Sequence, residues 1–599
     1  MFQTFETTAS PEQGPSRLAA LRQELAAQGL DGFMVPRADA HQGEYVAPCD
    51  DRLAWLTGFT GSAGFCIALA EVAGVFVDGR YRVQVKDQVA EDFTPVNWPE
   101  IQPGPWLKQQ LPEGGQIGFD PWLHTVEQIE KLETALAGSG ITLHPCTNLV
   151  DQIWEDRPAP PMAQAKAQPL EFAGESHDDK RARLARDLKA VGHQAVVITL
   201  PDSFAWLLNI RGGDIPRNPV AHGFAILNGD GLVDLFMAPA KLKGLAPHLG
   251  PDVRVHTPES FLDYLPTLPG PVRLDKSSVP QIVATTLRNA GTEIAWGEDP
   301  CVLPKACKTD AEIKGTTEAH LRDAAAMCEF LCWLDQNAGK GITEIDVVSE
   351  LEARRRATNA LEDISFDTIA GTGPNGAVIH YRVTHDTNRT LADGDLLVLD
   401  SGGQYLDGTT DITRTIAIGA PGEEERAAFT RVLQGMIAIS RLRWPIGLAG
   451  RDLEAVGRVP LWNAGQDFDH GLGHGVGAYL CVHEGPQRLS RISHVPLQPG
   501  MILSNEPGYY REGAFGIRIE NLIVVTPANK PEGGDSHRSM LRFDTLTFVP
   551  IDRRLIDTKV LTVAERDWLN AYHAECRDRI GPRLSDEAQL WLATAAAEI

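Results

Sequence analysis

Five residues in the last third of the chain have the types and the spacing needed to hold two divalent metal ions. They are four carboxylates and one imidazole: Asp400, Asp411, His474, Glu506 and Glu520. Four carboxylates that meet inside a sheet would repel one another and take up protons, whereas two doubly charged cations would balance their charge. Carboxylate and imidazole donors together suit manganese, zinc, cobalt or iron, while an all-oxygen set would indicate magnesium or calcium. A lone acidic residue is usually a solvated surface group, but five candidates in glycine-rich or strand-end settings favour a metal site.

The segments around these residues predict strands that would bring the carboxylates together. A short apolar run ends at Asp400, and a segment of alternating hydrophobicity extends from Asp411 to Ile418. The residues between them are rich in glycine and aspartate, which form turns, so we expect the two strands to pair and to place the two aspartates on facing ends. In the string GIRIEN, Arg518 and Glu520 are two residues apart and are expected to share one strand face.

The composition is that of an ordinary globular protein that is too long for a single core. The chain has 599 residues, of which 43% are hydrophobic and 23% are charged, so about two to four domains are expected. The net charge of −25 argues against nucleic acid or an anionic membrane as a partner. No apolar run reaches membrane-spanning length, and the first residues lack the basic start and apolar run of a signal peptide.

Cysteine usage fits a reducing compartment. The 9 cysteines are scattered and do not form a disulfide framework. Cys328 and Cys332 lie one helical turn apart in an apolar pattern, and we interpret them as small buried hydrophobic residues rather than as half of a metal site. These features predict a cytoplasmic protein.

An internal duplication organises the first half of the chain. Residues 17–35 read as a helix followed by a strand, and residues 183–198 repeat this pattern. Each copy continues into an Ala-Trp-Leu segment, at 54–56 and at 205–207. Residues 1–16 have no such pattern and are expected to form a loose tail. The first half is therefore predicted to be two related α/β domains.

Two boundaries divide the chain into three predicted domains. Residues 157–174 are rich in proline and alanine, which is typical of a linker. A capping box at residues 309–312 begins a helix whose apolar stripe is expected to lie in a core. We therefore predict domains at 1–156, 157–307 and 308–599, the last of which carries every candidate metal ligand.

Longer strings around the five candidate ligands resemble a known family. The strings TTDITRT, GHGVG, NEPGYY and GIRIEN are similar to those of the "pita-bread" dinuclear metallopeptidases, which include methionine aminopeptidase, Xaa-Pro dipeptidase (prolidase) and aminopeptidase P. The strings GTGPNGAVIHY, DSGGQYLDGTTDITRT and VHEGP most resemble aminopeptidase P of the long, three-domain type. The resemblance extends over essentially the whole chain.

The resemblance implies a fold and an activity. The fold would be two creatinase-like α/β domains followed by a pita-bread metallopeptidase domain. The activity would be hydrolysis of the bond between an N-terminal residue and proline by a hydroxide that bridges two divalent metals, with manganese expected and zinc or cobalt as alternatives. Peptides with proline in the second position would be the substrates. The long type usually forms a homodimer, and Trp462 lies where that family has an interface tryptophan.

The resemblance also assigns roles to the five ligands. Asp400 would hold one metal, and His474 with Glu506 would hold the other. Asp411 and Glu520 would bridge the two ions. Glu506 is in addition the candidate proton shuttle, which takes a proton from water and passes it to the nitrogen of the leaving group.

Four further residues have expected roles around the ligands. His470 and His483 flank the ligand histidine and are expected to bond the substrate carbonyl and the developing oxyanion. His380 would line the proline side of the site, and Arg518 would position Glu520 or a neighbouring histidine. The alternative for each histidine is a satisfied group in the core.

Two strings in the first domain also resemble the family, but simpler interpretations are preferred for both. DGRY at 78–81 lies between apolar segments and is interpreted as a hairpin turn. His41 could reach a neighbouring active site in an oligomer, and it is interpreted instead as a histidine on a surface loop.

Two alternative functions remain at this point. Prolidase performs the same chemistry on dipeptides only, but it usually has one N-terminal domain, so the duplication favours aminopeptidase P; methionine aminopeptidase lacks these domains. The same fold also occurs as a metal-free creatinase or as a protein-binding module. Those members have lost metal ligands, whereas all five are present here.

Overall fold

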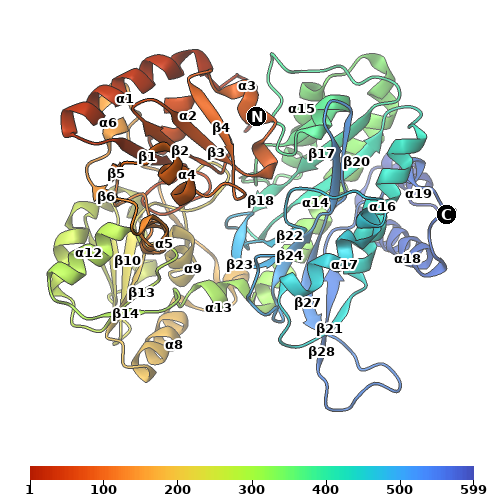
Figure 1. The fold of residues 1–599 in the computed structure, drawn as a ribbon. Coiled ribbons are helices and arrows are strands. Elements are labelled where there is room, and N and C mark those ends of the chain that lie inside the picture. Colours follow the sequence, from red (N-terminus) through yellow and green to blue (C-terminus); the bar gives the residue numbers. More distant parts are fainter. The chain divides into compact units, whose positions relative to one another are not determined.

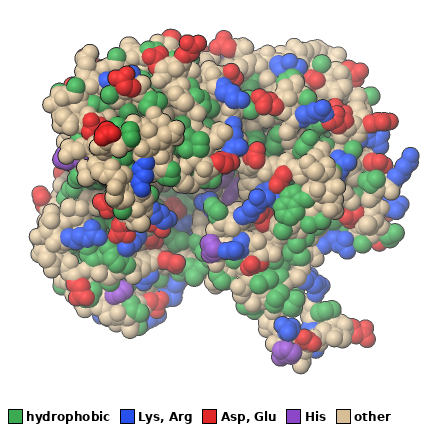
Figure 2. All heavy atoms as spheres, in the orientation of Figure 1, with side chains coloured by type: hydrophobic (Ala, Val, Ile, Leu, Met, Phe, Trp, Pro, Cys, Tyr) green, Lys and Arg blue, Asp and Glu red, His purple; other side chains and the backbone are tan.

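The computed structural model describes all residues from Met1 to Ile599, and the chain divides into two compact units (Figure 1). The N-terminal unit comprises Thr8–Leu170 and Glu175–Val302, and the C-terminal unit comprises Met1–Thr7, Glu171–Gly174 and Leu303–Ile599. Acidic and basic side chains are interspersed over the face seen in Figure 2. No helix is both long enough and apolar enough to cross a membrane.

The first domain of the N-terminal unit is a six-stranded sheet between two layers of helices. Its strands are β1 (Gly32–Pro36), β2 (Phe65–Leu69), β3 (Ala73–Val77), β4 (Phe93–Asn97), β5 (Gly115–Phe119) and β6 (Ile141–Pro145), and its main helices are α1 (Gly14–Gln28), α2 (Arg52–Thr57), α4 (Pro103–Gln110), α5 (Val126–Leu136) and α6 (Leu149–Ile153). The strand order is β4-β3-β2-β1-β5-β6. Apolar side chains of α1, α2 and α6 join one core cluster and those of α4 and α5 join another, so the sheet is covered on both faces.

The second domain repeats this arrangement strand for strand. Its strands are β8 (Ala195–Ile198), β10 (Phe224–Asn228), β11 (Val233–Phe236), β12 (Val253–His256), β13 (Val272–Leu274) and β14 (Ile294–Trp296). Their order is β12-β11-β10-β8-β13-β14. In the order given for each sheet, the first pair of strands is parallel, the next two pairs are antiparallel and the last two pairs are parallel. The predicted duplication and the α/β fold class are therefore confirmed.

The C-terminal unit consists of antiparallel sheets packed against long helices. The helices are α14 (Asp310–Asn337), α15 (Glu344–Arg356), α16 (Glu423–Ser440), α17 (Gly450–Trp462), α18 (Val563–Ile580) and α19 (Asp586–Ala595). One sheet has the order β16-β17-β20, formed by Ile369–Thr372, Leu396–Ser401 and Ile412–Ala417. A larger sheet has the order β21-β28-β27-β24-β22-β23, formed by Arg443–Pro445, Met540–Thr545, Asn521–Pro527, Ile502–Asn505, Gly473–Gly475 and Glu484–Leu489. A pair of helices thus precedes antiparallel strands twice along the chain.

Several local predictions for this unit are confirmed. Thr309 and Glu312 form the expected capping box at the start of α14. The stripe that includes Met327 and Leu331 lies in the main core of the unit, as does Cys328. β17 pairs with β20 and places Asp400 opposite Thr413, so the two aspartate-bearing strand ends are neighbours, although β20 begins one residue later than expected.

The predicted loose tail is wrong for the first residues, which pack on the C-terminal unit. The Phe2 backbone N–H donates to Glu352 Oε1 at 2.8 Å. The Gln3 side chain is 2% exposed and exchanges two hydrogen bonds with the Thr368 backbone, at 3.3 Å and 2.8 Å. The Gln3 side-chain amide bonds the Thr368 backbone much as a neighbouring strand would. Such a contact produces no hydrophobic periodicity in the sequence, so the segment was predicted to be a tail.

Two other predictions also need correction. DGRY is not a hairpin turn: Asp78 caps a short 3₁₀ helix, Gly79–Tyr81, and β3 and β4 on either side are parallel. Parallel strands cannot be joined by a tight hairpin. The predicted linker contains structure as well, because Lys166–Ala167 pairs with Ile210–Arg211 and Glu171–Gly174 belongs to the C-terminal unit.

Candidate metal centre

The four candidate carboxylates and the histidine lie at strand ends of the C-terminal unit. Asp400 is in β17, Asp411 directly precedes β20, and His474 is the middle residue of β22. Glu506 directly follows β24, and Glu520 lies between β27 and the preceding strand β26 (Phe515–Arg518). Asp400, Asp411 and Glu520 are 7%, 3% and 1% exposed, whereas the side chains of His474 and Glu506 are 18% and 16% exposed, so the centre is open to solvent on the side of these two residues.

His474 contacts two of the carboxylates through one ring nitrogen. Its Nε2 lies 3.3 Å from Glu506 Oε1 and 3.5 Å from Asp411 Oδ2. The other nitrogen, Nδ1, is 3.0 Å from the carbonyl oxygen of Gly475, which fixes Nδ1 as the donor and turns Nε2 toward the acids. The donor atoms of Asp411, His474 and Glu520 lie within 4.8 Å of one another. This is a suitable arrangement for shared cations.

The carboxylates and the histidine of the centre shift one another's pKa values. Burial, together with the nearby carboxylate of Asp400, raises the pKa of Asp411 to about 6. Burial and the charges of Asp411 and Glu506 raise the pKa of Glu520 well above its usual value. Burial alone would lower the pKa of His474, but its hydrogen bond to Asp411 and the charge of Glu506 raise it to about 9. Each group therefore favours the protonation state that reduces net negative charge.

Unsatisfied oxygens show that these residues fit two divalent cations. Asp400 Oδ1, Asp411 Oδ1 and Glu520 Oε1 are buried and accept no hydrogen bond. Such atoms are expensive to bury unless a partner is present. Carboxylate oxygens with one imidazole nitrogen form a donor set that binds manganese, zinc or cobalt.

Arg518 pairs with Asp400 rather than with Glu520. Its Nη2 is 2.7 Å from Asp400 Oδ2, and the guanidinium is 2% exposed. It reaches Glu520 only through Thr413, whose hydroxyl accepts from Arg518 Nε at 3.2 Å and donates to Glu520 Oε2 at 2.7 Å. Arg518 is the last residue of β26 and Glu520 lies outside that strand, so the two side chains do not share a strand face as predicted.

The structure places the other three predicted residues around this centre in different ways. The ring of His483 packs edge-on against that of His474, with centroids 4.4 Å apart. Both nitrogens of His470 already have partners: Nδ1 is 2.7 Å from the Gly471 carbonyl and Nε2 is 3.0 Å from the Tyr510 hydroxyl. His380 is half-buried and follows Ile379, whose carbonyl accepts from Arg518 at 3.3 Å.

Sequence reasoning missed three residues that support the centre. The Tyr510 hydroxyl accepts from Arg518 Nη1 at 2.6 Å and also contacts His470, and burial raises its pKa to about 12. The Ser504 hydroxyl accepts from the His474 backbone and donates to Glu506 Oε1, both at 2.9 Å. Thr413 is the third. All three lie within two to four residues of a candidate ligand. This closeness in sequence was the only signal available, because hydroxyl-bearing residues show no spacing that predicts such a role.

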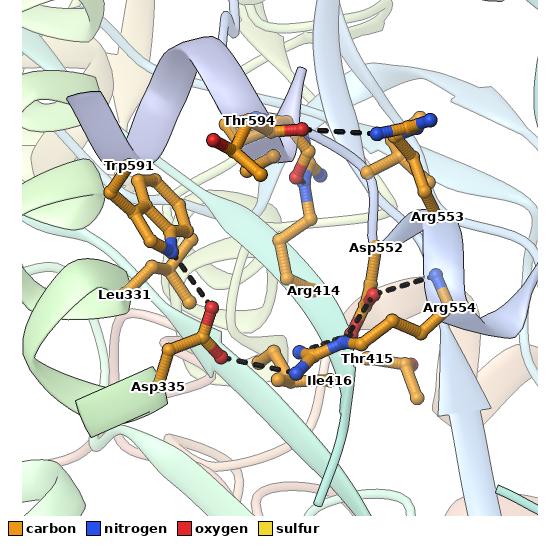
Figure 3. Close-up of a pocket in the computed structure, with 13 residues that line it drawn as sticks. Leu331, Asp335, Arg414, Thr415, Ile416, Asp552, Arg553, Arg554, Trp591 and Thr594 are labelled. Carbon is orange, nitrogen blue, oxygen red and sulfur yellow. Dashed lines mark hydrogen bonds and ion pairs between the residues drawn. The ribbon is translucent and has the colours of Figure 1, made fainter. Parts of the chain in front are cut away.

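A separate cavity of about 210 Å³ lies beside this region (Figure 3). None of the five candidate ligands lines it. Trp591 donates to Asp335 at 2.7 Å, and Arg554 lies between Asp335 and Asp552. Arg414 forms part of the wall and donates to the backbone carbonyl of Glu520 at 2.6 Å. Arg554 is ion-paired with both acidic residues of the wall, and Arg414 and Arg553 donate to backbone carbonyls. We therefore interpret these side chains as structural.

His41 is not on the surface loop that the sequence suggested. It is 6% exposed and its Nδ1 is 3.1 Å from the carbonyl of Thr199, in the second domain of the same unit. Its ring lies against that of His222, which contacts Asp39 at 3.3 Å. Burial is the main reason that the pKa of His41 falls to about 3. The residue is a neutral packing group between the two duplicated domains.

Comparisons with known proteins agree with this arrangement. Residues 314–527 match the model of metallopeptidase family M24 and residues 539–599 match its C-terminal region. Residues 17–153 and 156–312 each match a creatinase/prolidase N-terminal domain. An aminopeptidase P2 from Arabidopsis thaliana is 38% identical over 94% of this chain and 85% of its own length. A probable Xaa-Pro aminopeptidase P from Laccaria bicolor is 38% identical over 96% of this chain and 92% of its own.

A solved structure is similar over the whole length. The X-prolyl aminopeptidase of Caenorhabditis elegans, described as a cytosolic enzyme with a di-nuclear active site, has a TM-score of 0.93 and 32% identity, covering 98% of this chain and 100% of that one. The buried ligand cluster, the duplicated N-terminal domains and these full-length relatives lead to one conclusion: the chain belongs to the Xaa-Pro aminopeptidase (aminopeptidase P) family of M24 metallopeptidases.

Proposed function

We propose that this enzyme releases the N-terminal residue from peptides with proline in the second position, using two divalent cations held by Asp400, Asp411, His474, Glu506 and Glu520. The observation that carries the proposal is the set of three buried carboxylate oxygens without hydrogen bonds in a cluster that also contains His474. When bound, the cations supply Lewis acidity and lower the pKa of a water so that it becomes a nucleophile near neutral pH. Manganese is the proposed metal, and zinc and cobalt suit the same donors.

The side chains have separate roles as metal ligands and in proton transfer. Asp411 and Glu520 are the proposed bridging ligands, Asp400 holds one ion, and His474 with Glu506 holds the other. Glu506, oriented by Ser504, moves a proton from the attacking water to the proline nitrogen that leaves.

We propose unequal roles for the two additional histidines. His483 stabilises the oxyanion that forms on the substrate carbonyl. His470 contributes less to this charge, because both of its ring nitrogens are engaged by Gly471 and Tyr510. His380 lines the proline side, and Arg518 holds Asp400 in place.

Proline explains why a dedicated enzyme is needed. The bond before proline is a tertiary amide without an N–H group. A peptidase that binds the substrate backbone by hydrogen bonds therefore finds no donor at this position of the substrate. We propose an enzyme that acts in the cytoplasm as a homodimer, with boundaries at 156/157 and 307/308 between its three domains. Trp462, which is 41% exposed at the end of α17, is the proposed interface residue.

A hydrolysis panel tests the proposal. Metal-stripped protein is reloaded with manganese, zinc or cobalt and given Xaa-Pro dipeptides, Xaa-Pro-Xaa tripeptides, the amidated tripeptides and a Met-Ala peptide. We expect cleavage at the Xaa-Pro bond, with kcat/KM for tripeptides at least equal to that for dipeptides and little effect of amidation. A strong preference for free dipeptides that is lost on amidation would make the enzyme a prolidase. Full activity in protein verified to be metal-free would refute the role of the five ligands.

A further inference from the structure

Three buried charged residues form a cluster next to His483. Lys305 Nζ lies 2.8 Å from Glu484 Oε2. Lys308 Nζ donates to the other carboxylate oxygen, Oε1, and also to the Lys305 carbonyl, the latter at 2.8 Å. The side chains of Lys305, Lys308 and Glu484 are 2%, 1% and 0% exposed. This lysine–glutamate–lysine clamp is a different cluster from the metal centre, and nothing in the proposed chemistry uses it.

The clamp is costly for a purely structural element. Each charge removed from water loses hydration worth several kcal/mol, and well-packed apolar residues of similar size are often as stable or more so. The energy is recovered only when the ion pairs hold their partners in a defined geometry. A buried carboxylate that is paired with two ammonium groups is therefore best explained if the pairs fix the position of a neighbouring functional residue.

Glu484 connects the clamp to two histidines of the active site. It directly follows His483, and in the sheet it pairs with Gly475, which directly follows His474. A Cβ atom on Gly475 would lie 2.3 Å from the Glu484 carbonyl oxygen, so the two backbones meet more closely than any other residue allows. The position of Glu484 thus sets the spacing between His483 and His474.

Backbone pairing alone does not define this position. The register of β22 and β23 shifts between His474 and Gly475, which leaves residues 485–487 without a pairing partner in β22. β22 is only three residues long, Gly473–Gly475. A short ladder with a bulge is weakly specified. The loop before His483 is held at Leu480, whose carbonyl accepts from Gln404 at 2.8 Å, and the side chain of Glu484 provides a second attachment on the other side of His483.

The lysines are fixed to a third strand of the same sheet. The Lys308 N–H donates to the Gly500 carbonyl at 3.1 Å, and Cys307 forms a bridge with Met501. β24 begins at the next residue, Ile502, and leads to Glu506. The clamp therefore ties the strand before Glu506 to the strand that follows His483.

We propose that Lys305 and Lys308 are positioning residues that act through Glu484 to hold His483 where it stabilises the oxyanion. This inference rests on the role of His483 proposed above. None of the clamp residues is a proposed ligand, but Glu484 pairs with Gly475, the residue after His474, so the expected loss is one of turnover number per bound metal ion.

A double-mutant cycle tests the proposal. Glu484→Gln and Lys308→Gln are each made alone and in combination with His483→Ala, and kcat, KM and metal content are measured. Either clamp substitution alone should lower kcat by about 10–100-fold, since a displacement near 1 Å is sufficient for such a loss. In the His483→Ala background the same substitution should lower kcat by less than about twofold, because the residue through which it acts is absent.

Two features of the design keep the outcomes separate. Glu484→Gln leaves two buried ammonium groups unpaired and could prevent folding, whereas Lys308→Gln keeps a neutral Lys305–Glu484 pair and serves as the second variant. Glu352→Gln, which removes a carboxylate that is 3% exposed elsewhere in the C-terminal unit, controls for general loss of a buried charge and should leave kcat near normal. Clamp substitutions that leave kcat unchanged, or that reduce it equally with and without His483, would overturn the clamp alone. An unchanged kcat in His483→Ala with full metal content would overturn the role of His483, and the clamp with it.

Discussion

Metal binding by this enzyme should release protons, and the amount can be worked out from the pKa values at the centre. His474 has a pKa of about 9 in the metal-free protein and Asp411 a pKa of about 6. At pH 7 the histidine is therefore almost fully protonated and the aspartate is protonated in roughly one molecule in ten. Ligands must lose their protons to bind a metal. With Glu520, whose pKa is also raised, we expect about one to two protons to be released per protein at pH 7.

The same groups give the sign of the stability effect. The folded-state pKa of His474 is raised above 6.5, so its contribution to the metal-free protein is present below pH 6.5 and is lost as the pH rises through about 9. This shift corresponds to about 3 kcal/mol. For Asp411 the protonated form is favoured, so stability falls as the pH rises from 3.8 to about 6. The metal-free protein should melt at lower temperature as the pH rises from 6 to 9, while the increase in Tm on adding metal should grow.

Calorimetry provides the measurement. Titrating manganese into metal-free protein in buffers of different ionisation enthalpy gives the number of protons released, and repeating this from pH 6 to pH 9 gives its pH dependence. Because the slope of log affinity against pH equals the number of protons released, the apparent affinity should rise by about ten- to hundredfold per pH unit between pH 6 and 8 and level off above pH 9. His474→Gln should reduce the release by about one proton. A release below about half a proton at pH 7, or an affinity independent of pH, would refute the electrostatic description of the centre.

Three further predictions concern single residues. His483→Ala should lower kcat by about 10²–10³-fold with metal content near normal, and His470→Ala should lower it less; loss of metal in proportion to activity would instead make either residue a ligand or ligand support. Arg518→Met should lower the free energy of unfolding, measured with urea, by about 3–5 kcal/mol because it leaves a buried carboxylate unpaired; a cost below about 1 kcal/mol would contradict this. If the enzyme is the proposed homodimer, Trp462→Glu should dissociate it in sedimentation experiments, while Leu590→Glu, at a residue that is 74% exposed on α19, should not; a folded and active Trp462→Glu dimer would remove the proposed interface.

The parts of the site that the sequence predicted are those governed by local patterns. Alternating hydrophobicity was enough to predict the pairing of the strands of Asp400 and Asp411. The residues between them are not a simple turn, because Gly403–Tyr405 and Gly408–Thr409 pair with each other in a separate sheet. The duplicated domains were visible for the same reason, since each copy repeats the order of helix, glycine and strand.

Long-range side-chain partners could not be predicted in this way. Arg518 was predicted to position Glu520 or a neighbouring histidine, yet its guanidinium pairs with Asp400, 118 residues earlier, and reaches Glu520 only through Thr413. The choice depends on which strands the sheets bring together, and alternation alone does not contain that information. His41 was misjudged for a related reason: its neighbours Thr199 and His222 come from the other copy of the duplicated domain.

The first seven residues have a consequence for synthesis of the chain. Glu352 and Thr368, which bind Phe2 and Gln3, leave the ribosome roughly 350 residues after them. At about 5–20 residues per second, the segment waits roughly 20–70 s for its partners. During that time the N-terminal unit, whose last residue, Val302, is made about 50 residues before Glu352, can begin to fold as a separate body. A fragment that begins at Leu303 would lack the segment altogether, and we expect it to need a peptide of residues 1–7, supplied separately, to reach full stability.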